Sequence, residues 1–477
     1  MAVQEFLTQA RALCGEAHVA GAAEIEPRYL QPARYGAGQA AAWARPGDAA
    51  QAAALLALAR RHGLRVVPQG AHTGLVRAAT PQDARRDLVL STERLREVFE
   101  LDELDRTLRV SAGWRLSEIN ERLAPLGLWF PIDLSADPSV GGMLSHNTGG
   151  TRMLRYGDVR ANTLGLVVLP AETLGHDGPL RLGQGLQKDN SALALQQLFI
   201  GASGSLGLIV EATLKLSPLP RQRAVALLAP RDTAAVLPLY QAAMARWGSL
   251  VSAFEGLSRE ALAAGLHGQD LSRWFRGRLP EYALLIELGS ELPRQQLDLA
   301  QLLQVGLEED LACGLLSDAV LEADEAVWAL RHRISEGLRA QGTVIGLDLS
   351  LPRRHFMALR ERGRAWLAAH WPQARLADFG HLGDGGLHFN VLWPREAGPL
   401  APGQDLALRQ AVYAMVAELG GSISAEHGVG PQLAQAYRAH WQGLNPALLA
   451  WSGRLQSLFD PERQMGLAEW GLEAMTD

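Results

Sequence analysis

Cysteine is scarce in this chain of 477 residues, and Cys14 and Cys313 are the only two. Two thiols cannot build a disulfide framework, a cysteine-rich zinc module or an iron–sulfur centre. The scarcity therefore indicates a reduced, globular protein. At this length, with 48% hydrophobic residues, we expect two or three domains.

Long apolar runs and excess positive charge are also missing. No run approaches the roughly 20 residues that a membrane helix needs, and the start, MAVQEFLTQARALCGEAH, has no basic segment followed by an apolar one. The net charge is −6, with 45 basic against 51 acidic residues, so no basic field attracts nucleic acid. We expect a cytoplasmic protein that neither spans a membrane nor binds nucleic acid, with peripheral membrane attachment left open.

Lysine is the third scarce residue: Lys188 and Lys215 stand alone, so 43 of the 45 basic residues are arginine. An arginine at an expected lysine position therefore carries little information, whereas any other replacement is informative. Neither lysine lies in a Walker-type G-K-[ST] sequence, and no G-x-G-x-x-G follows a predicted strand. These absences disfavour a P-loop NTPase and a Rossmann dehydrogenase.

Three glycine-rich segments are present instead: PQGAHTGL (68–75), PSVGGMLSHNTGGTRMLRYG (138–157) and IGASGSLG (200–207). Glycine permits positive φ and lacks Cβ, so backbone N–H groups can converge on an anion. Two such loops together could clasp a diphosphate. Each loop by itself is better explained as a tight turn.

The hydrophobic pattern predicts two mixed segments. In the first, over about 40–220, helices at 48–63 and 116–126 alternate with strands at 64–70, 88–90, 107–110, 164–169 and 206–216. From about 222, helices near 234–245, 293–310, 324–341 and 353–370 alternate with strands at 282–289, 344–352 and 376–392. This second pattern predicts an antiparallel sheet with helices on one face.

The segment FGHLGDGGLHFNV (379–391) carries two histidines around a glycine-rich turn. If Asp384 and Gly385 are the central residues of a two-residue hairpin, His381 lies opposite His388, and Asn390 points to the same face. GGSISAEHGVG (420–430), a β-like run, adds Glu426. Two histidines and a carboxylate with an open position are typical of a catalytic zinc site. The alternative is a pair of structural histidines beside a turn.

In this order, the three glycine-rich segments resemble the FAD-binding domain of the vanillyl-alcohol oxidase/p-cresol methylhydroxylase (PCMH) superfamily. KDNSALALQQLFIGASGSLGLIVEATLKL (188–216) resembles its 2-hydroxy-acid dehydrogenase branch. In that superfamily the first two loops wrap the FAD diphosphate and the third lies near the flavin and adenine. The resemblance thus assigns FAD contacts to Pro68, Gln69, Gly70, Ala71, His72, Thr73, Gly74, Leu75, Pro138, Ser139, Gly141, Gly142, Ser145, Asn147, Thr148, Gly150, Gly204, Gly207 and Ile209.

Three residues depart from the superfamily pattern: Ala71, His72 and Ser203 replace a glycine, an asparagine and an acidic residue. More distant members attach flavin through a histidine at the position of His72. The D-2-hydroxy-acid branch holds FAD non-covalently, so we interpret His72 as a loop histidine that forms hydrogen bonds near the diphosphate.

G-H-x-G-D-G-x-L-H followed by S-x-x-A-E-H-G-x-G resembles the signature of FAD- and metal-dependent D-2-hydroxy-acid dehydrogenases. The resemblance assigns a divalent ion, usually zinc, to His381, His388 and Glu426, and the role of catalytic base to His427. In WALRHRISEGLRAQGTVIGLDLSLP (328–352) it assigns substrate contacts to Arg331 and Ser335, and we add Asn390 and His427 to that set.

Some expected residues are missing from the C-terminal half. Gly346 occupies the position of a substrate-binding lysine, Gly386 that of an asparagine and Leu433 that of a lysine, and MGLAEW (465–470) replaces M-N-P-G-K. The missing cation at Gly346 weakens the case for a distal carboxylate on the substrate. The remaining candidate substrates are D-lactate, a bulkier apolar hydroxy acid, or a dicarboxylate bound by another arginine.

The predicted fold is α+β: an N-terminal helical segment (1–37), a two-subdomain PCMH-type FAD-binding domain (38–221), an antiparallel-sheet substrate or cap domain (222–425) and a C-terminal segment returning to the flavin site (426–477). The predicted function is oxidation of a D-2-hydroxy acid, first D-2-hydroxyglutarate, with D-lactate or a glycolate-oxidase-like activity as the alternative. Electrons would pass to an electron-transfer flavoprotein or a quinone or cytochrome chain, and a homodimer is left open. The competing hypotheses are a zinc hydrolase without flavin and a flavoprotein that has lost catalysis.

Overall fold

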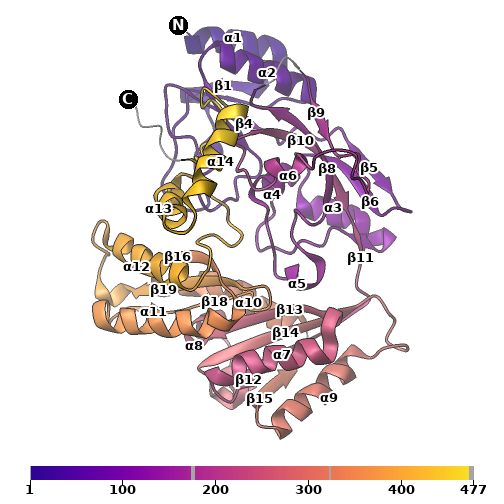
Figure 1. Cartoon of the computed structure of the whole chain (residues 1–477), viewed down its shortest axis with the longest axis vertical. Helices are drawn as coiled ribbons and strands as arrows, with labels where there is room; N and C mark the ends of the chain where they lie inside the picture. Colours follow the sequence, from indigo (N-terminus) through magenta and orange to yellow (C-terminus); the bar gives the residue numbers. More distant parts are fainter. Residues whose placement is uncertain (1, 173–177, 322–323, 472–477) are drawn as a thin grey trace. The chain divides into compact units, whose positions relative to one another are not determined.

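The computed structural model describes residues 2–172, 178–321 and 324–471, and the chain divides into two compact units (Figure 1). Unit 1 comprises Met1–Gly149, Asp158–Pro218 and Glu426–Asp477, and unit 2 comprises Gly150–Gly157 and Leu219–Ala425. The C-terminal segment therefore belongs to the same unit as the N-terminal half. Among the described residues, no helix combines the length and apolar character needed to cross a membrane.

The first sheet of unit 1 has four strands in the order β1 (Val19–Gly21), β2 (Ala42–Ala44), β4 (Asp87–Ser91) and β3 (Arg65–Gln69). Strand β1 is antiparallel to β2, and the other pairs are parallel. Helices α1 (Ala2–Cys14) and α2 (Ala49–Arg61) share a core with this sheet. Asp48 caps α2 by accepting a hydrogen bond from the Gln51 N–H (2.7 Å). Strand β3 leads directly into the first glycine-rich segment.

The second sheet of unit 1 is antiparallel, in the order β5 (Phe99–Asp102), β6 (Thr107–Ser111), β10 (Gly207–Lys215), β8 (Thr163–Pro170) and β9 (Leu180–Leu182). Helices α3 (Leu116–Leu123) and α4 (Val140–His146) bury Ile119, Val140 and Leu144 in its core. Strands β7 (Leu128–Trp129) and β11 (Ser217–Pro218) form a two-stranded ladder, and α6 (Gln196–Phe199) precedes the third glycine-rich segment.

The C-terminal segment of unit 1 contains α13 (Ala434–Leu444) and α14 (Pro446–Phe459). Phe459 at the end of α14 packs edge-on against Phe199, with ring centroids 5.5 Å apart. Beyond α14, Met465 forms an isolated parallel bridge with Val66 of β3. This segment is therefore tied to both sheets of unit 1.

Unit 2 is built on one antiparallel sheet, in the order β15 (Leu316–Leu321), β12 (Gln222–Pro230), β14 (Tyr282–Ser290), β13 (Val251–Ser258), β18 (Phe379–Gly380), β19 (Gly386–Pro394) and β16 (Gly342–Ser350). Strand β17 (Arg375–Leu376) also pairs with β19. Residues on β12, β13 and β14 alternate between two apolar faces, because both faces are covered.

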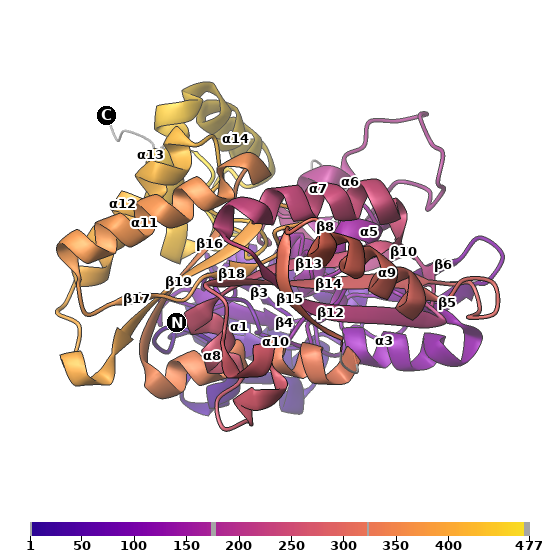
Figure 2. The same ribbon diagram turned by 90° about the horizontal axis from the view of Figure 1, so that it is seen from below.

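Helices cover both faces of this sheet rather than the single face predicted. Helices α8 (Arg259–Gly265) and α10 (Asp324–Gln341) pack on the face that carries Ala253 and Leu257. Helices α7 (Val236–Trp247) and α9 (Leu299–Ala312) lie on the other face (Figure 2), where Tyr240 contacts Phe254. Helix α11 (Phe356–His370) lies over Phe389 of β19. Helix α12 (Gln404–Glu418) follows it in the chain. Helix α5 (Met153–Tyr156) packs near β13.

The predicted α+β class, with an antiparallel sheet in the second half of the chain, is confirmed. Most predicted helices and strands are present with ends shifted by a few residues. The helix predicted from 293 begins only at Leu299, because Asp298 is its cap and accepts a hydrogen bond from the Gln301 N–H. The β-like run at 420–430 is wrong as a strand: it is an extended loop whose single bridge joins Ser422 to Ser350.

Candidate functional site

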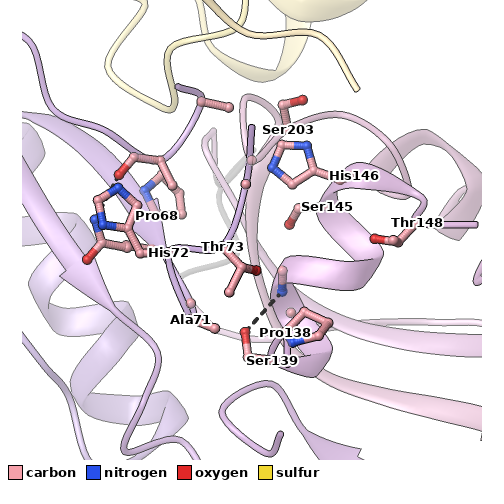
Figure 3. A pocket seen from close by; sticks show the side chains of 18 of the residues that line it. Pro68, Ala71, His72, Thr73, Pro138, Ser139, Ser145, His146, Thr148 and Ser203 are labelled. Atoms are coloured by element: carbon pink, nitrogen blue, oxygen red, sulfur yellow. Dashed lines mark hydrogen bonds between the residues drawn. The ribbon is translucent and has the colours of Figure 1, made fainter. Parts of the chain in front are cut away.

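The three glycine-rich segments line one pocket in unit 1 (Figure 3). The first follows β3, the second surrounds α4, and the third leads into β10. Figure 3 shows Pro68 and His72 on one side and Ser145, His146 and Thr148 on the other. Of the predicted FAD-contacting residues, the pocket is lined by Pro68, Gln69, Gly70, Ala71, His72, Thr73, Gly74, Leu75, Pro138, Ser139, Gly141, Gly142, Ser145, Thr148, Gly204, Gly207 and Ile209.

Two predicted residues do not line this pocket. The side chain of Asn147 is used inside unit 1, since its amide donates to Asp158 (2.9 Å) and its oxygen accepts from the Arg160 N–H (2.9 Å). Asn147 also ends α4 in the left-handed conformation (φ 49°), which asparagine tolerates better than most residues. Gly150 falls in unit 2.

Glycine is required where the loops meet, because side chains of the neighbouring loop leave no room for a Cβ. A Cβ on Gly70 would lie 2.1 Å from Ser139 Oγ, and one on Gly204 (φ 73°) would lie 3.1 Å from Pro68 Cγ. Ser139 Oγ accepts a hydrogen bond from the Gly142 N–H (3.3 Å), the dashed line in Figure 3. The loops thus fit against one another only without side chains, which leaves their backbone amides along the pocket.

Both ring nitrogens of His72 form hydrogen bonds within the protein. Nδ1 lies 3.1 Å from the Arg28 carbonyl oxygen and Nε2 lies 3.1 Å from Thr80 Oγ1. Burial lowers the pKa of His72, so the ring is neutral at pH 7. This arrangement agrees with the interpretation of His72 as a hydrogen-bonding loop residue.

His146 was not predicted as a site residue, but it lies where four motifs meet. A Cβ on Gly74 would lie 3.6 Å from His146 Nε2, and one on Gly428 would lie 2.7 Å from its Nδ1. Ser203 of the third segment donates to the Val429 carbonyl oxygen (2.7 Å). Burial, and then the neighbouring charge of His427, lower the pKa of His146 to about 4. The E-H-G turn therefore packs directly on the glycine-rich loops.

Glu426 and His427 line the same pocket as those loops. His427 Nε2 lies 3.6 Å from a Glu426 carboxylate oxygen, and about a fifth of each side chain is exposed (21% and 16%). Gly428 has φ 78°, a conformation that only glycine adopts readily. The turn thus presents a carboxylate and an imidazole to the pocket.

The MGLAEW segment (465–470) packs against the third glycine-rich segment. A Cβ on Gly466 would lie 2.8 Å from Ser205 Cα, and Trp470 Nε1 donates to Ser205 Oγ (2.7 Å). Although this segment departs from the expected ending, it supports the loop that carries Ser203.

In unit 2 the two histidines are neighbours, but the predicted hairpin register is wrong. His388 pairs with Phe379, not with His381. The carbonyl oxygen of His381 accepts from the N–H groups of Asp384, Gly385 and Gly386 (3.0–3.1 Å), so the turn is longer than two residues. The imidazoles of His381 and His388 still meet edge to face, with ring centroids 5.4 Å apart.

Strands β16 and β19 carry further polar residues on the face of His388. Asp348 lies opposite His388 and Gly346 lies opposite Asn390. An Asp348 carboxylate oxygen is 3.8 Å from His388 Nδ1, and Asn390 is buried. The other face of the same strands carries Leu347, Leu349 and Phe389 in the core. Alternation along the strands therefore gathers the polar side chains on one face.

A glutamate that the sequence analysis missed joins two predicted site residues. Glu255 on β13 accepts from His381 Nδ1 (2.5 Å) and from Arg331 Nε on α10 (2.6 Å). Burial would raise the pKa of Glu255, but the charges of and hydrogen bonds from His381 and Arg331 outweigh it and lower the pKa to about 2. The signal was present: Glu255 is the one charged residue in the strand VSAFEGLS.

The two predicted substrate residues on α10 differ in exposure. Arg331 is buried and stacks over Phe379, 4.5 Å from the ring centroid. Ser335, one turn later, is exposed. Because the Nε of Arg331 is engaged by Glu255, a bidentate contact to a carboxylate would use its two Nη groups.

The chain passes from unit 2 to unit 1 directly beside Asp348. The N–H of Ala425, the last residue of unit 2, donates to Asp348 Oδ2 (3.0 Å). Glu426 follows Ala425, and consecutive Cα atoms are about 3.8 Å apart.

The donor set fits a divalent ion. Glu255 on Nδ1 of His381 selects the tautomer in which Nε2 carries the lone pair that a metal would need. Two imidazoles and a carboxylate are ligands that zinc prefers. Within unit 2, His381, His388 and Asp348 are residues of these types.

Comparison with known families gives two matches. The model described as "FAD binding domain" matches residues 40–173, and the model described as "FAD linked oxidases, C-terminal domain" matches residues 219–466. The chain is 35% identical to D-2-hydroxyglutarate dehydrogenase, mitochondrial, of Bos taurus over 85% of this chain and 73% of that protein. It is 30% identical to D-2-hydroxyglutarate dehydrogenase of Stutzerimonas stutzeri (strain A1501) over 87% of this chain and 88% of that protein.

Solved structures share the fold at low sequence identity. A structure of p-cresol methylhydroxylase with substrate bound has a TM-score of 0.71 and 13% identity over 96% of this chain and 95% of that chain. A structure of alkyldihydroxyacetonephosphate synthase has a TM-score of 0.71 and 15% identity over 97% of this chain and 84% of that chain.

Proposed function

The chain belongs to the family of FAD-linked oxidases and is an FAD-dependent oxidoreductase, and on this basis we propose that it oxidises a D-2-hydroxy acid to the corresponding 2-keto acid. One observation carries the proposal: Glu426 and His427 of the E-H-G turn line the same pocket as the three glycine-rich segments. This observation supports a proton acceptor at the pocket that would hold the flavin.

The flavin is held, in this proposal, by the backbone of 68–75 and 138–148 and by the third segment. Their amides line the pocket because the glycines there have no side chains to cover them. When bound, FAD supplies an acceptor for the hydride that leaves the substrate's α-carbon. The hydrogen-bonded ring of His72 supports non-covalent binding.

The metal is held, in this proposal, by His381, His388 and Glu426, and zinc is the first candidate. The edge-to-face imidazoles and the connection of Glu426 through Ala425 to Asp348 support this set. When bound, a divalent ion lowers the pKa of the hydroxyl that it contacts and fixes its orientation.

The remaining roles belong to side chains of the protein. An imidazole nitrogen of His427 accepts the proton of the substrate hydroxyl, with Glu426 beside it to orient the ring. Arg331 binds the substrate's carboxylate through its Nη groups while Glu255 holds its Nε. Ser335 and Asn390 contribute further hydrogen bonds to the substrate.

D-2-hydroxyglutarate is the first candidate substrate, because the bovine and Stutzerimonas relatives carry that name. Gly346 offers no cation for the distal carboxylate, but Arg409 on α12 donates from Nη1 to the Gly346 carbonyl oxygen (3.2 Å). A guanidinium thus lies next to the position of the missing lysine. D-lactate or another D-2-hydroxy monocarboxylate, as in a glycolate-oxidase-like enzyme, is the alternative.

Electrons pass, in this proposal, to an electron-transfer flavoprotein or a quinone or cytochrome chain, and the protein acts in the cytoplasm. Membership of the FAD-linked oxidases favours this redox reaction over a zinc hydrolase without flavin, since hydrolysis needs no FAD-binding domain.

A screen of D- and L-2-hydroxy acids for anaerobic flavin reduction tests the proposal. We expect a yellow protein whose absorbance near 450 nm is bleached by D-2-hydroxyglutarate and not by the L-enantiomer.

Arg409→Met should raise KM for D-2-hydroxyglutarate at least ~10-fold and leave KM for D-lactate unchanged, because one charge-assisted hydrogen bond is lost. Tight FAD that no D-2-hydroxy acid bleaches would instead support a flavoprotein without catalysis.

A further inference from the structure

Glu255 joins two elements that otherwise have separate roles in the site. It lies on β13, and none of its surface is exposed. One carboxylate oxygen accepts from His381 Nδ1 at 2.5 Å, and the other accepts from Arg331 Nε at 2.6 Å. The two donors come from the turn before β19 and from α10, so a single side chain spans both.

The contact to His381 determines which ring nitrogen faces a metal. A carboxylate accepts hydrogen bonds and donates none, so His381 Nδ1 must carry a proton. The neutral ring then ligates through Nε2. Carboxylates that hold ligating histidines in this way are typical of metal sites.

The contact to Arg331 fixes a guanidinium beside the histidine pair. Its Nε is held by Glu255, and its plane lies over the ring of Phe379, 4.5 Å from the centroid. The same Phe379 ring lies 5.2 Å from the ring of His388. Arg331 is thus held from two sides, next to both histidines.

We propose that Glu255 is a positioning residue that sets the distance between the metal ligand His381 and the substrate-binding Arg331. This inference rests on the proposed function. A 2-hydroxy acid carries its hydroxyl and carboxylate on adjacent carbons, so a metal that takes the hydroxyl and an arginine that takes the carboxylate must keep a fixed spacing. Glu255 provides it because one rigid, buried carboxylate binds both partners.

Glutamine at position 255 cannot reproduce both contacts. Its amide has one acceptor oxygen, whereas the carboxylate offers one to each partner. If the oxygen faces Arg331, the NH₂ group faces His381 Nδ1 and favours the wrong tautomer. If the oxygen faces His381, the NH₂ group opposes the Nε–H of Arg331. Glu255→Gln therefore impairs metal binding or substrate binding.

Glu287 offers a matched control on the adjacent strand β14. It is also buried, and it pairs with Arg152 (2.7 and 2.8 Å), Ser252 (2.6 Å) and Trp328 (2.8 Å). None of these three partners is a histidine. Glu287→Gln thus removes an equivalent buried charge without touching the histidine pair.

The experiment measures zinc affinity on the full-length, FAD-loaded protein after chelation, by titration with Zn²⁺ alone. We expect Glu255→Gln to raise the Kd for zinc or the KM for the D-2-hydroxy acid by 10- to 100-fold, the usual range for such partners, and Glu287→Gln to change either by less than about twofold. Wild-type values of both in a folded Glu255→Gln protein would overturn the inference.

If Glu255→Gln does not fold, Glu255→Asp replaces it, because it keeps the charge but is one methylene too short to reach both partners. A weakened Kd or KM in Glu255→Asp supports the inference, and unchanged values overturn it. Failure of the proposed function itself is seen separately in the wild type, which would then bind no zinc and show no bleaching by any D-2-hydroxy acid.

Discussion

At the residue scale, the chemistry of the site depends on a few side chains whose neighbours determine their state. His427 lies beside Glu426 in the pocket, and His146 lies under the E-H-G turn. Glu255 holds His381 and Arg331. The roles proposed for His427 and Arg331 come from sequence motifs, whereas Glu255 lies 126 positions from His381 and belongs to no motif. Only the folded sheet brings that pair together.

Replacement of the proposed base separates catalysis from cofactor binding. His427→Ala should retain FAD and lower the rate of anaerobic flavin bleaching by at least ~100-fold, the usual size of a general-base contribution. Stopped-flow absorbance measures this rate. His62→Ala, at the end of α2, serves as the control and should bleach at the wild-type rate. A His427→Ala protein that bleaches normally would show that another group takes the proton.

The histidine under the turn makes stability depend on pH. The pKa of His146 is lowered to about 4 in the folded protein from 6.5. Above pH 6.5 the ring is neutral in both states and has no effect. As the pH falls from 6.5 to 4 the unfolded chain takes up a proton that the folded chain does not, so the free energy of unfolding should fall by about 1–3 kcal/mol. Denaturant unfolding measures the free energy of unfolding at each pH. Between pH 6.5 and 4 this free energy should fall less steeply with decreasing pH in His146→Gln than in the wild type.

At the element scale, the sequence pattern locates most helices and strands but not how they pair. Periodicity predicts α2, α10, β14 and β16 because apolar spacing is a local property. The register of β18 with β19 is set instead by the His381 carbonyl oxygen, which closes a longer turn than Asp384-Gly385 implied. Helices cover both faces of the unit 2 sheet because β12 to β14 are apolar on both sides, a pattern that does not reveal which helix lies on which face.

The glycine-rich loops act as an element whose fit can be tested by one methyl group. Gly70→Ala places a Cβ 2.1 Å from Ser139 Oγ, so either Ser139 gives up its hydrogen bond from the Gly142 N–H or the loop shifts away from α4. Overpacking of this kind costs about 1–3 kcal/mol, and we expect weaker FAD retention on gel filtration together with a lower Tm. At Gly36 a Cβ meets nothing within 4 Å, and Gly36→Ala should retain FAD. Equal retention by both variants would show that the loop tolerates the added methyl group.

At the scale of the whole molecule, the proposed site residues belong to two different units. The residues of the glycine-rich segments that line the pocket, together with Glu426 and His427, belong to unit 1. His381, His388 and Arg331 belong to unit 2. The sequence motifs predict both sets. The resemblance also predicts a C-terminal segment, 426–477, that returns to the flavin site, and in the structure this segment belongs to unit 1, where Glu426 and His427 line the pocket of the glycine-rich segments.

The central claim is that substrate oxidation needs both the flavin of unit 1 and a metal bound by the histidines of unit 2. The direct test strips metal from the FAD-loaded protein with a chelator and follows anaerobic bleaching by D-2-hydroxyglutarate, before and after zinc is added back. We predict that bleaching is lost with the metal, returns with zinc in the wild type, and does not return in His381→Gln. Bleaching at the full rate in the metal-free, FAD-loaded protein would contradict the account.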